Sequence, residues 1–132
     1  MRVISKHRMA CVIFAIVTGL FGVFHLFYAE NLAKKVPDFM PGGIIWVHIS
    51  AAAFILFSLS ILLDKFTKFS CYALAVMLFI FIITVHVPIA LTTTDEFVKQ
   101  ETLLMMIKDI GLVMAALLVG YNSDRPDNAP NL

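Results

Sequence analysis

Charged residues are scarce in this chain. Asp, Glu, Lys and Arg supply 14% of its 132 residues, whereas apolar types supply 61%, and the mean hydropathy is +0.92. Soluble domains usually contain ~45–50% apolar residues. The composition therefore excludes an ordinary soluble domain and predicts a membrane protein with hardly any mass outside the bilayer.

Motifs of soluble redox and metal enzymes are missing as well. The two cysteines, Cys11 and Cys71, have no Cys-x-x-Cys spacing. No His-x-x-x-His, Glu-x-x-His or nucleotide-binding motif occurs either. We expect both cysteines to be reduced packing residues rather than a redox pair. Catalysis by this chain alone is not expected.

Long apolar runs are what the sequence does contain. Each is close to the ~20 residues that a helix needs to cross a hydrocarbon core ~30 Å thick. None has the alternation of a barrel strand, and a lone strand could not satisfy its backbone in lipid. The sequence predicts an all-α transmembrane four-helix bundle in one domain, residues 1–121, followed by a disordered polar tail, 122–132. The expected spans are residues 9–29, 44–63, 69–91 and 103–121.

The distribution of basic residues predicts the orientation. With four spans, both termini and the middle loop share one side, which holds six Lys or Arg residues against three on the other. Basic residues in short loops mark the cytoplasmic face, so both termini are expected in the cytoplasm. The first run is longer than the ~7–15 apolar residues of a signal peptide, so we expect a retained span. A multi-pass protein of a bacterial inner membrane is the predicted location.

The two outer connections carry turn and cap signals. Residues 37–43 contain two prolines and two glycines, which break any helix there, and Trp46 follows at the depth of an aromatic belt. We expect an ordered turn at the lipid surface. In the second connection, Thr93 and Glu96 have capping-box spacing, which predicts a helix start near Thr94.

Five ionisable residues are expected at one depth. His25 and His86 lie near the outer ends of spans one and three, His48 near the outer start of span two, and Lys108 and Asp109 in the outer half of span four. An ionisable group facing lipid costs ~2.5–3.5 kcal/mol. The five side chains should therefore turn inward and form a polar pocket.

Small-residue periodicity and one proline support this arrangement. Pro88 has no amide hydrogen, so the carbonyl of Thr84 loses its helical partner one turn from His86. On the helix faces that carry His25, His86 and Asp109, small residues repeat at three- and four-residue steps. Small residues let helices approach closely, within one bundle or between two bundles. These faces are Ala15, Gly19 and Gly22 with His25, Cys71 and Ala75 with His86, and Ala116 and Gly120 with Asp109.

Three interpretations of this polar layer remain open. Its three histidines could bind zinc, copper or haem iron, although the ligand spacing of such sites is missing. A quinone head group could be met by a histidine together with Lys108 or Asp109. The third interpretation has no chemistry: His25 and His48 hydrogen-bond near the interface, and Lys108 extends to the outer surface.

Three short motifs occur in the first half of the chain: Gly-Val-Phe-His at 22–25, Val-Pro-x-Phe-x-Pro at 36–41 and Trp-Val-x-Ile-Ser at 46–50. With these motifs, and over roughly residues 15–120, the chain resembles the DoxX family of small four-span membrane proteins. The resemblance implies the four-span fold. Family members are associated with a quinone-reducing thiosulfate oxidation complex, an oxidative-stress membrane complex and the assembly of receptor channels. The glutamate usual in span two is missing from residues 50–54, and His48 and Asp109 are expected to replace it.

The sequence thus predicts a DoxX-like membrane subunit of a redox system. It would bind a quinone or another lipid-soluble ligand at the polar layer, with haem or a metal less favoured. The alternative is a non-enzymatic assembly factor or scaffold for a partner membrane protein. The expected partners are the lipid bilayer, a membrane or soluble redox protein and a second copy of the chain, but not nucleic acid.

Overall fold

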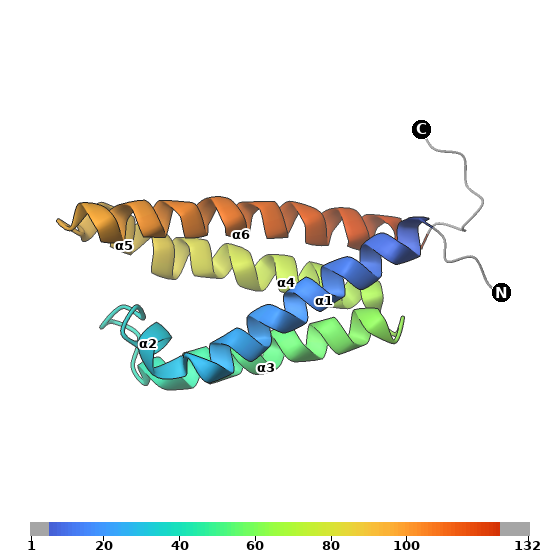
Figure 1. Cartoon of the computed structure of the whole chain (residues 1–132), viewed down its shortest axis with the longest axis horizontal. Helices are drawn as coiled ribbons and strands as arrows, with labels where there is room; N and C mark the ends of the chain where they lie inside the picture. The colour runs from blue at the N-terminus through green and yellow to red at the C-terminus, as the bar shows by residue number, and fades with distance from the viewer. Residues whose placement is uncertain (1–5, 125–132) are drawn as a thin grey trace.

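Helices account for all regular secondary structure in the computed structural model, which describes residues 6–124 (Figure 1). Four long antiparallel segments form a bundle, and the third consists of α4, η1 and α5 in succession. The elements are α1 Lys6–Phe27, α2 Ala29–Ala33, α3 Gly43–Leu62, α4 Thr67–Phe81, the π-helical turn η1 Ile82–His86, α5 Val87–Thr92 and α6 Glu96–Asn122.

Four segments are long and apolar enough to cross a membrane: Lys6–Phe27, Gly43–Leu62, Thr67–Thr92 and Glu96–Asn122. The predicted all-α transmembrane four-helix bundle is confirmed, and the protein is an integral, multi-pass membrane protein. With 27 residues, α6 is ~40 Å long. That exceeds a hydrocarbon core of ~30 Å, so α6 extends beyond it. Of the predicted tail, residues 125–132 lie outside the described part of the chain.

The start of α6 differs from the expected capping box. Asp95 is the N-cap residue, and its Oδ1 accepts hydrogen bonds from the amides of Phe97 and Val98 at 2.8 and 3.2 Å. The hydroxyl of Thr93 instead accepts from the Asp95 amide at 3.3 Å. A carboxylate adds favourable charge to the positive end of the helix dipole, which a threonine hydroxyl cannot supply.

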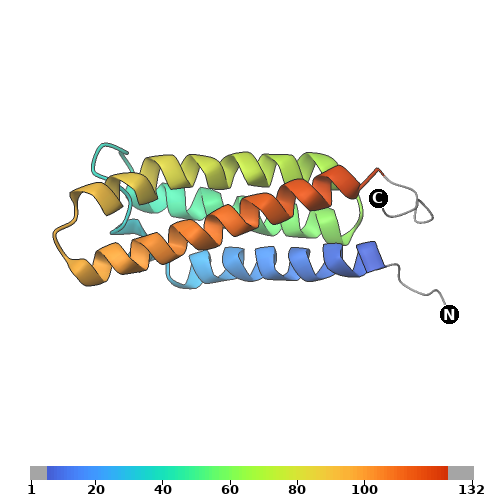
Figure 2. The ribbon, with the colours of Figure 1, turned by 90° about the horizontal axis from the view of Figure 1, so that it is seen from above.

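The bundle has two distinct ends. At the terminal end, α1 begins, α6 ends and residues 63–66 join α3 to α4 (Figures 1 and 2). At the loop end, residues 28–42 join α1 to α3 and residues 93–95 join α5 to α6. The first of these connections contains the short helix α2 before the expected proline and glycine turn.

Close packing joins the helices mainly in two pairs, α1 with α3 and α4 with α6 (Figure 1). A Cβ atom added to Gly22 would lie 2.7 Å from the Ile55 side chain and 3.0 Å from the Ala51 carbonyl. The Ser58 hydroxyl donates to the Ala15 carbonyl at 2.7 Å. The glycine stripe of α1 thus serves a contact within the bundle, where packing and hydrogen bonds replace the hydrophobic effect.

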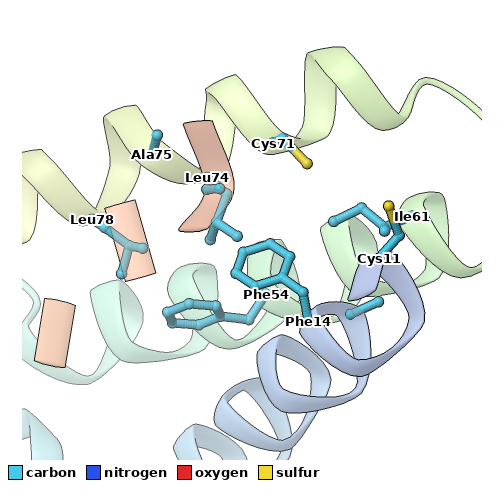
Figure 3. Packing of buried hydrophobic residues seen from close by; sticks show 10 residues of the cluster. Cys11, Phe14, Phe54, Ile61, Cys71, Leu74, Ala75 and Leu78 are labelled. Atoms are coloured by element: carbon cyan, nitrogen blue, oxygen red, sulfur yellow. The ribbon is translucent and has the colours of Figure 1, made fainter. Parts of the chain in front are cut away.

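The apolar core lies nearer the terminal end. Figure 3 shows Phe14 of α1 and Phe54 of α3 facing Leu74 of α4. Cys11 and Cys71 belong to the same cluster, and both are buried and free of disulfides. Their burial fits the packing role expected from the sequence.

At the terminal end, one arginine binds the last carbonyls of α3. The Arg8 guanidinium donates to the carbonyls of Ile61 and Leu62 at 2.9 and 2.5 Å, and lies 3.7 Å from an Asp64 carboxylate oxygen. The last carbonyls of a helix have no partner of their own. Arg8 therefore closes the end of α3 and ties α1 to it.

Candidate functional site

Asp109 is the centre of a buried polar cluster. Its side chain is 5% exposed, with Oδ2 2.9 Å from His86 Nε2 and Oδ1 3.1 Å from Lys108 Nζ. A carboxylate in its ionised form only accepts hydrogen bonds, and in that form the shared proton lies on His86 Nε2. Burial favours such pairing because an isolated charge in this environment is costly. We call these three residues the triad.

The face of α6 that carries Asp109 packs against α4. Ala116 and Gly120 are buried on this face, as their spacing predicts. A Cβ atom on Gly120 would lie 3.0 Å from the Cβ of Cys71. Small residues thus bring α6 close to α4, and this contact fixes the side from which Asp109 meets His86.

His86 is the last residue of the π turn η1. The amide of Val87 bonds to the carbonyl of Ile82, five residues earlier. Pro88 follows within the first turn of α5 and cannot donate a helical hydrogen bond. π turns are rare inside α-helices, and those that occur are frequent at functional sites. The proline was the sequence signal of this irregularity, but the π turn itself was not predicted.

Lys108 connects the triad to α1. Its ammonium lies 4.6 Å from the centre of the Phe21 ring, and 43% of its side chain is exposed. Such a cation–π contact contributes ~0.5–2 kcal/mol, depending on how far the cation is desolvated. The ammonium therefore has two partners inside the bundle, Asp109 and Phe21, instead of only reaching outward to the surface.

His25 lies beside the triad on α1. Its Nδ1 is 2.7 Å from the Phe21 carbonyl, and its half-buried ring lies 5.2 Å from the Phe54 ring of α3. A carbonyl oxygen only accepts, so Nδ1 carries a proton and, in the neutral ring, Nε2 is an acceptor. Phe21 thus contacts both polar groups, His25 through its carbonyl and Lys108 through its ring.

His48 does not join this layer. Its side chain is exposed on α3, whereas the buried face of that helix follows Val47, Ala51 and Phe54. One residue is ~100° around a helix, which turns His48 away from the face that includes Val47. This corrects the expectation that all five ionisable residues turn inward. Small residues at 51–53 made the inner face of α3 ambiguous in the sequence.

The three histidines consequently do not meet around one point. Within residues 6–124, no group of three or more His, Cys, Asp or Glu side chains is placed to hold a metal ion. The polar cluster instead joins one acid, one imidazole and one amine. These groups suit hydrogen bonding and proton exchange with a bound molecule.

An open cavity at the loop end was not predicted. It has a volume of about 500 Å³ and lies between the 34–38 segment and the adjoining ends of α5 and α6. Lys35 Nζ and Glu101 Oε1 form an ion pair across it at 2.7 Å. The path of the loop over α6 creates this cavity, and no local sequence pattern encodes such a path. Its lining includes Pro37, Pro88, Thr92 and Thr102.

Comparisons of the chain with protein-family models, with curated proteins and with solved structures give no significant match. The resemblance to the DoxX family therefore stays a prediction.

Proposed function

We propose that the protein is a membrane subunit of a redox system and binds a quinone, or a similar lipid-soluble carbonyl compound, at the triad. The observation that carries this proposal is the direct contact of the buried Asp109 carboxylate with both His86 and Lys108, in a bundle whose other buried polar side chains, among the described residues, are Ser and Thr hydroxyls. The resemblance to DoxX proteins, some of which are associated with quinone reduction, points to the same ligand class.

The chemistry of the three side chains fits a quinone head group. Quinone carbonyl oxygens accept hydrogen bonds, and the Lys108 ammonium and a protonated His86 imidazole donate them. Reduction of a quinone to a quinol takes up two electrons and two protons. The histidine and carboxylate can exchange protons, whereas the electrons come from a partner subunit.

The surroundings of Lys108 offer a way in from the bilayer. Its side chain is half-exposed beside Phe21, where α1 and α6 pack less closely than α1 and α3. A head group could replace the Phe21 ring as the partner of the ammonium while its apolar tail stays among the acyl chains. Ligand-binding sites of proteins generally combine apolar walls with a few precisely placed polar groups.

Binding of a short-tailed ubiquinone analogue to the purified protein in lipid nanodiscs tests the proposal. Hydrogen bonds that involve a charged group contribute ~1.5–3 kcal/mol, which corresponds to a change in Kd of ~10- to 150-fold. We expect Asp109→Asn and His86→Gln to weaken binding within that range. His48→Gln, which changes the exposed histidine of α3, is the matched control and should bind like the parent protein.

Equal affinity in all four proteins would overturn the proposal. A purely structural triad would show a different pattern: no saturable quinone binding in the parent protein, together with lower thermal stability of the Asp109 and His86 variants. Measuring the unfolding temperature of each variant alongside the titration separates these two results.

A further inference from the structure

Part of the lining of the loop-end cavity is polar, although the cavity belongs to a membrane protein. Its walls carry the charged side chains of Lys34, Lys35, Asp38 and Glu101. Lys35 and Glu101 are both partly exposed, and their ion pair spans from the loop to α6. Hydrocarbon chains do not solvate such groups, so the natural content of this cavity is water.

The volume and position of the cavity agree with hydration. At ~30 Å³ for each water molecule, its 500 Å³ holds on the order of ten waters. The cavity lies beside the first turns of α6, the helix that is longer than the hydrocarbon core is thick. Irregular backbone within a membrane is tolerated where it lines water or protein, and Pro88, two residues after η1, lines this cavity.

The cavity and the triad are built on the same two segments. Pro88, in the cavity wall, is two residues after His86. Thr102, at the inner side of the cavity, is buried and seven residues before Asp109. Seven residues are two helical turns, so the two side chains share a face about 10 Å apart along α6.

We propose that this cavity is a water-filled vestibule through which the His86–Asp109 pair exchanges protons with the aqueous phase at the loop end. Glu101 is the carboxylate at its mouth, and Lys35 holds it there. The proton-exchange role rests on the proposed redox function, but the hydration of the cavity does not.

The turn of α6 between the vestibule and the triad carries Met105 and Met106, both half-buried. Methionine side chains are unbranched and flexible, so they leave a route that water can cross when they change rotamer. The proposed path thus runs from Glu101 past Thr102 and this pair of methionines to Asp109.

Charged groups surround both ends of this path. Glu101 faces Lys35, with Lys34 and Asp38 on the same loop, while α5 contributes the neutral Thr92. Asp109 faces His86 of η1 and its own neighbour Lys108, with His25 of α1 nearby. The ion-pair partner of Glu101 thus comes from the 34–38 loop, and the imidazole partner of Asp109 comes from η1.

Water access along the path is tested by cysteine labelling. Thr102→Cys and Met106→Cys place a thiol at the inner side of the vestibule and on the turn below it. Leu104→Cys, whose native side chain is 67% exposed on the lipid-facing side of the same helix, is the matched control. The parent protein is the blank, because its two cysteines are buried in the core. The probe is a permanently charged, membrane-impermeant thiosulfonate added to oriented vesicles from either side.

Thiosulfonates react with the thiolate, which forms in water but not in lipid. We expect Thr102→Cys and Met106→Cys to react at least tenfold faster than Leu104→Cys, and only from the loop-end side. Slow labelling of Thr102→Cys, or labelling from the terminal end, would overturn the vestibule. Fast labelling of Thr102→Cys with an unreactive Met106→Cys would overturn the route to the triad.

A kinetic measurement tests the role of Glu101. If quinone binds, ferricyanide added to the quinol-loaded protein accepts the two electrons of the quinol, one per ferricyanide, and the quinol releases two protons. This proton release should slow several-fold in Glu101→Gln and stay unchanged in Lys99→Gln, which alters a nearby charge outside the cavity. An unchanged rate in Glu101→Gln would remove Glu101 from the proposal. If no quinone binds, the redox function fails and so does the proton-exchange role, whereas the labelling pattern still decides whether the cavity is hydrated.

Discussion

The two ends of this bundle satisfy their polar groups in opposite ways. At the terminal end, a short turn joins α3 to α4, and Arg8 closes the last carbonyls of α3 against an apolar core. At the loop end, the long connection between α1 and α3 borders an open cavity, and the triad lies below it. One end thus uses its charges to hold helices together, whereas the other keeps charged groups beside space that a molecule can enter.

The tightness of helix packing decides where a small membrane bundle can accommodate a site. Close α1–α3 and α4–α6 packing, with glycine at the crossing points, leaves no room between the helices of each pair. The two pairs contact each other less closely, and Lys108 of α6 meets Phe21 of α1 at this looser junction. Rigid pairs with a looser junction are suited to hold side chains in position while a ligand enters.

Removing the carboxylate at the centre of the triad should have the largest effect. Asp109→Ala leaves His86 and Lys108 without their shared partner, and breaking a buried pair in this way costs ~3–5 kcal/mol. Reversible unfolding in mixed detergent micelles measures this loss. The double variant with His86→Ala should lose less than the sum of the two single variants. Simple additivity would show that the two side chains do not interact.

Breaking the close packing of α1 on α3 should have the second-largest effect on stability. A Cβ atom at Gly22 meets the backbone of α3 at 3.0 Å, so Gly22→Ala should reduce the free energy of unfolding by ~1–3 kcal/mol. Gly111→Ala is the control, because no atom lies within 4 Å of its added Cβ. Equal stabilities of the two variants would contradict the pairing of these helices.

At the terminal end, Arg8→Gln should have a moderate effect. It removes charged hydrogen bonds to the last carbonyls of α3, which contribute ~1.5–3 kcal/mol, although water can replace part of them. Amide hydrogen exchange at residues 61–66 should accelerate, while exchange around the triad stays the same. Lys6→Gln removes the same charge from an exposed position and should change neither region. Faster exchange throughout the protein would mean that the two ends are not independent.

The loop-end ion pair should matter least for stability. Lys35 and Glu101 are both partly exposed, and such pairs contribute ~0–1 kcal/mol. Lys35→Gln should nevertheless increase labelling of Thr102→Cys several-fold, because the ion pair crosses the mouth of the cavity. Lys34→Gln, at the neighbouring position, is the control. A large loss of stability without faster labelling would assign the pair a structural role.

Local patterns predicted the spans and part of the site. Hydropathy located four helices because each must satisfy its own backbone in lipid. The small-residue face of α6 correctly placed Asp109 towards the interior, since a short, charged side chain in a span needs a partner. His48 was misplaced because three alanines follow it on α3, and small residues allow several faces to be the inner one.

Features that depend on tertiary contacts could not be predicted from the sequence. The segment Thr92–Glu96 offers several residues able to cap a helix, and the path of the chain selected Asp95. Only the folded course of residues 34–38 over α6 reveals the cavity. Pro88 signalled an irregular helix, but whether a helix answers with a kink or a π turn depends on its neighbours.

The π turn η1 also sets the rotation of the following helix, α5, about its axis. It holds one residue more than an α-helical turn would, and one residue corresponds to ~100° about the helix axis. Compared with an uninterrupted continuation of α4, α5 is therefore rotated about its axis. This rotation places Pro88 and Thr92 in the lining of the loop-end cavity. Deleting one of residues 82–85 would remove the extra residue and rotate α5 by ~100° about its axis, away from the position in which it forms part of that lining.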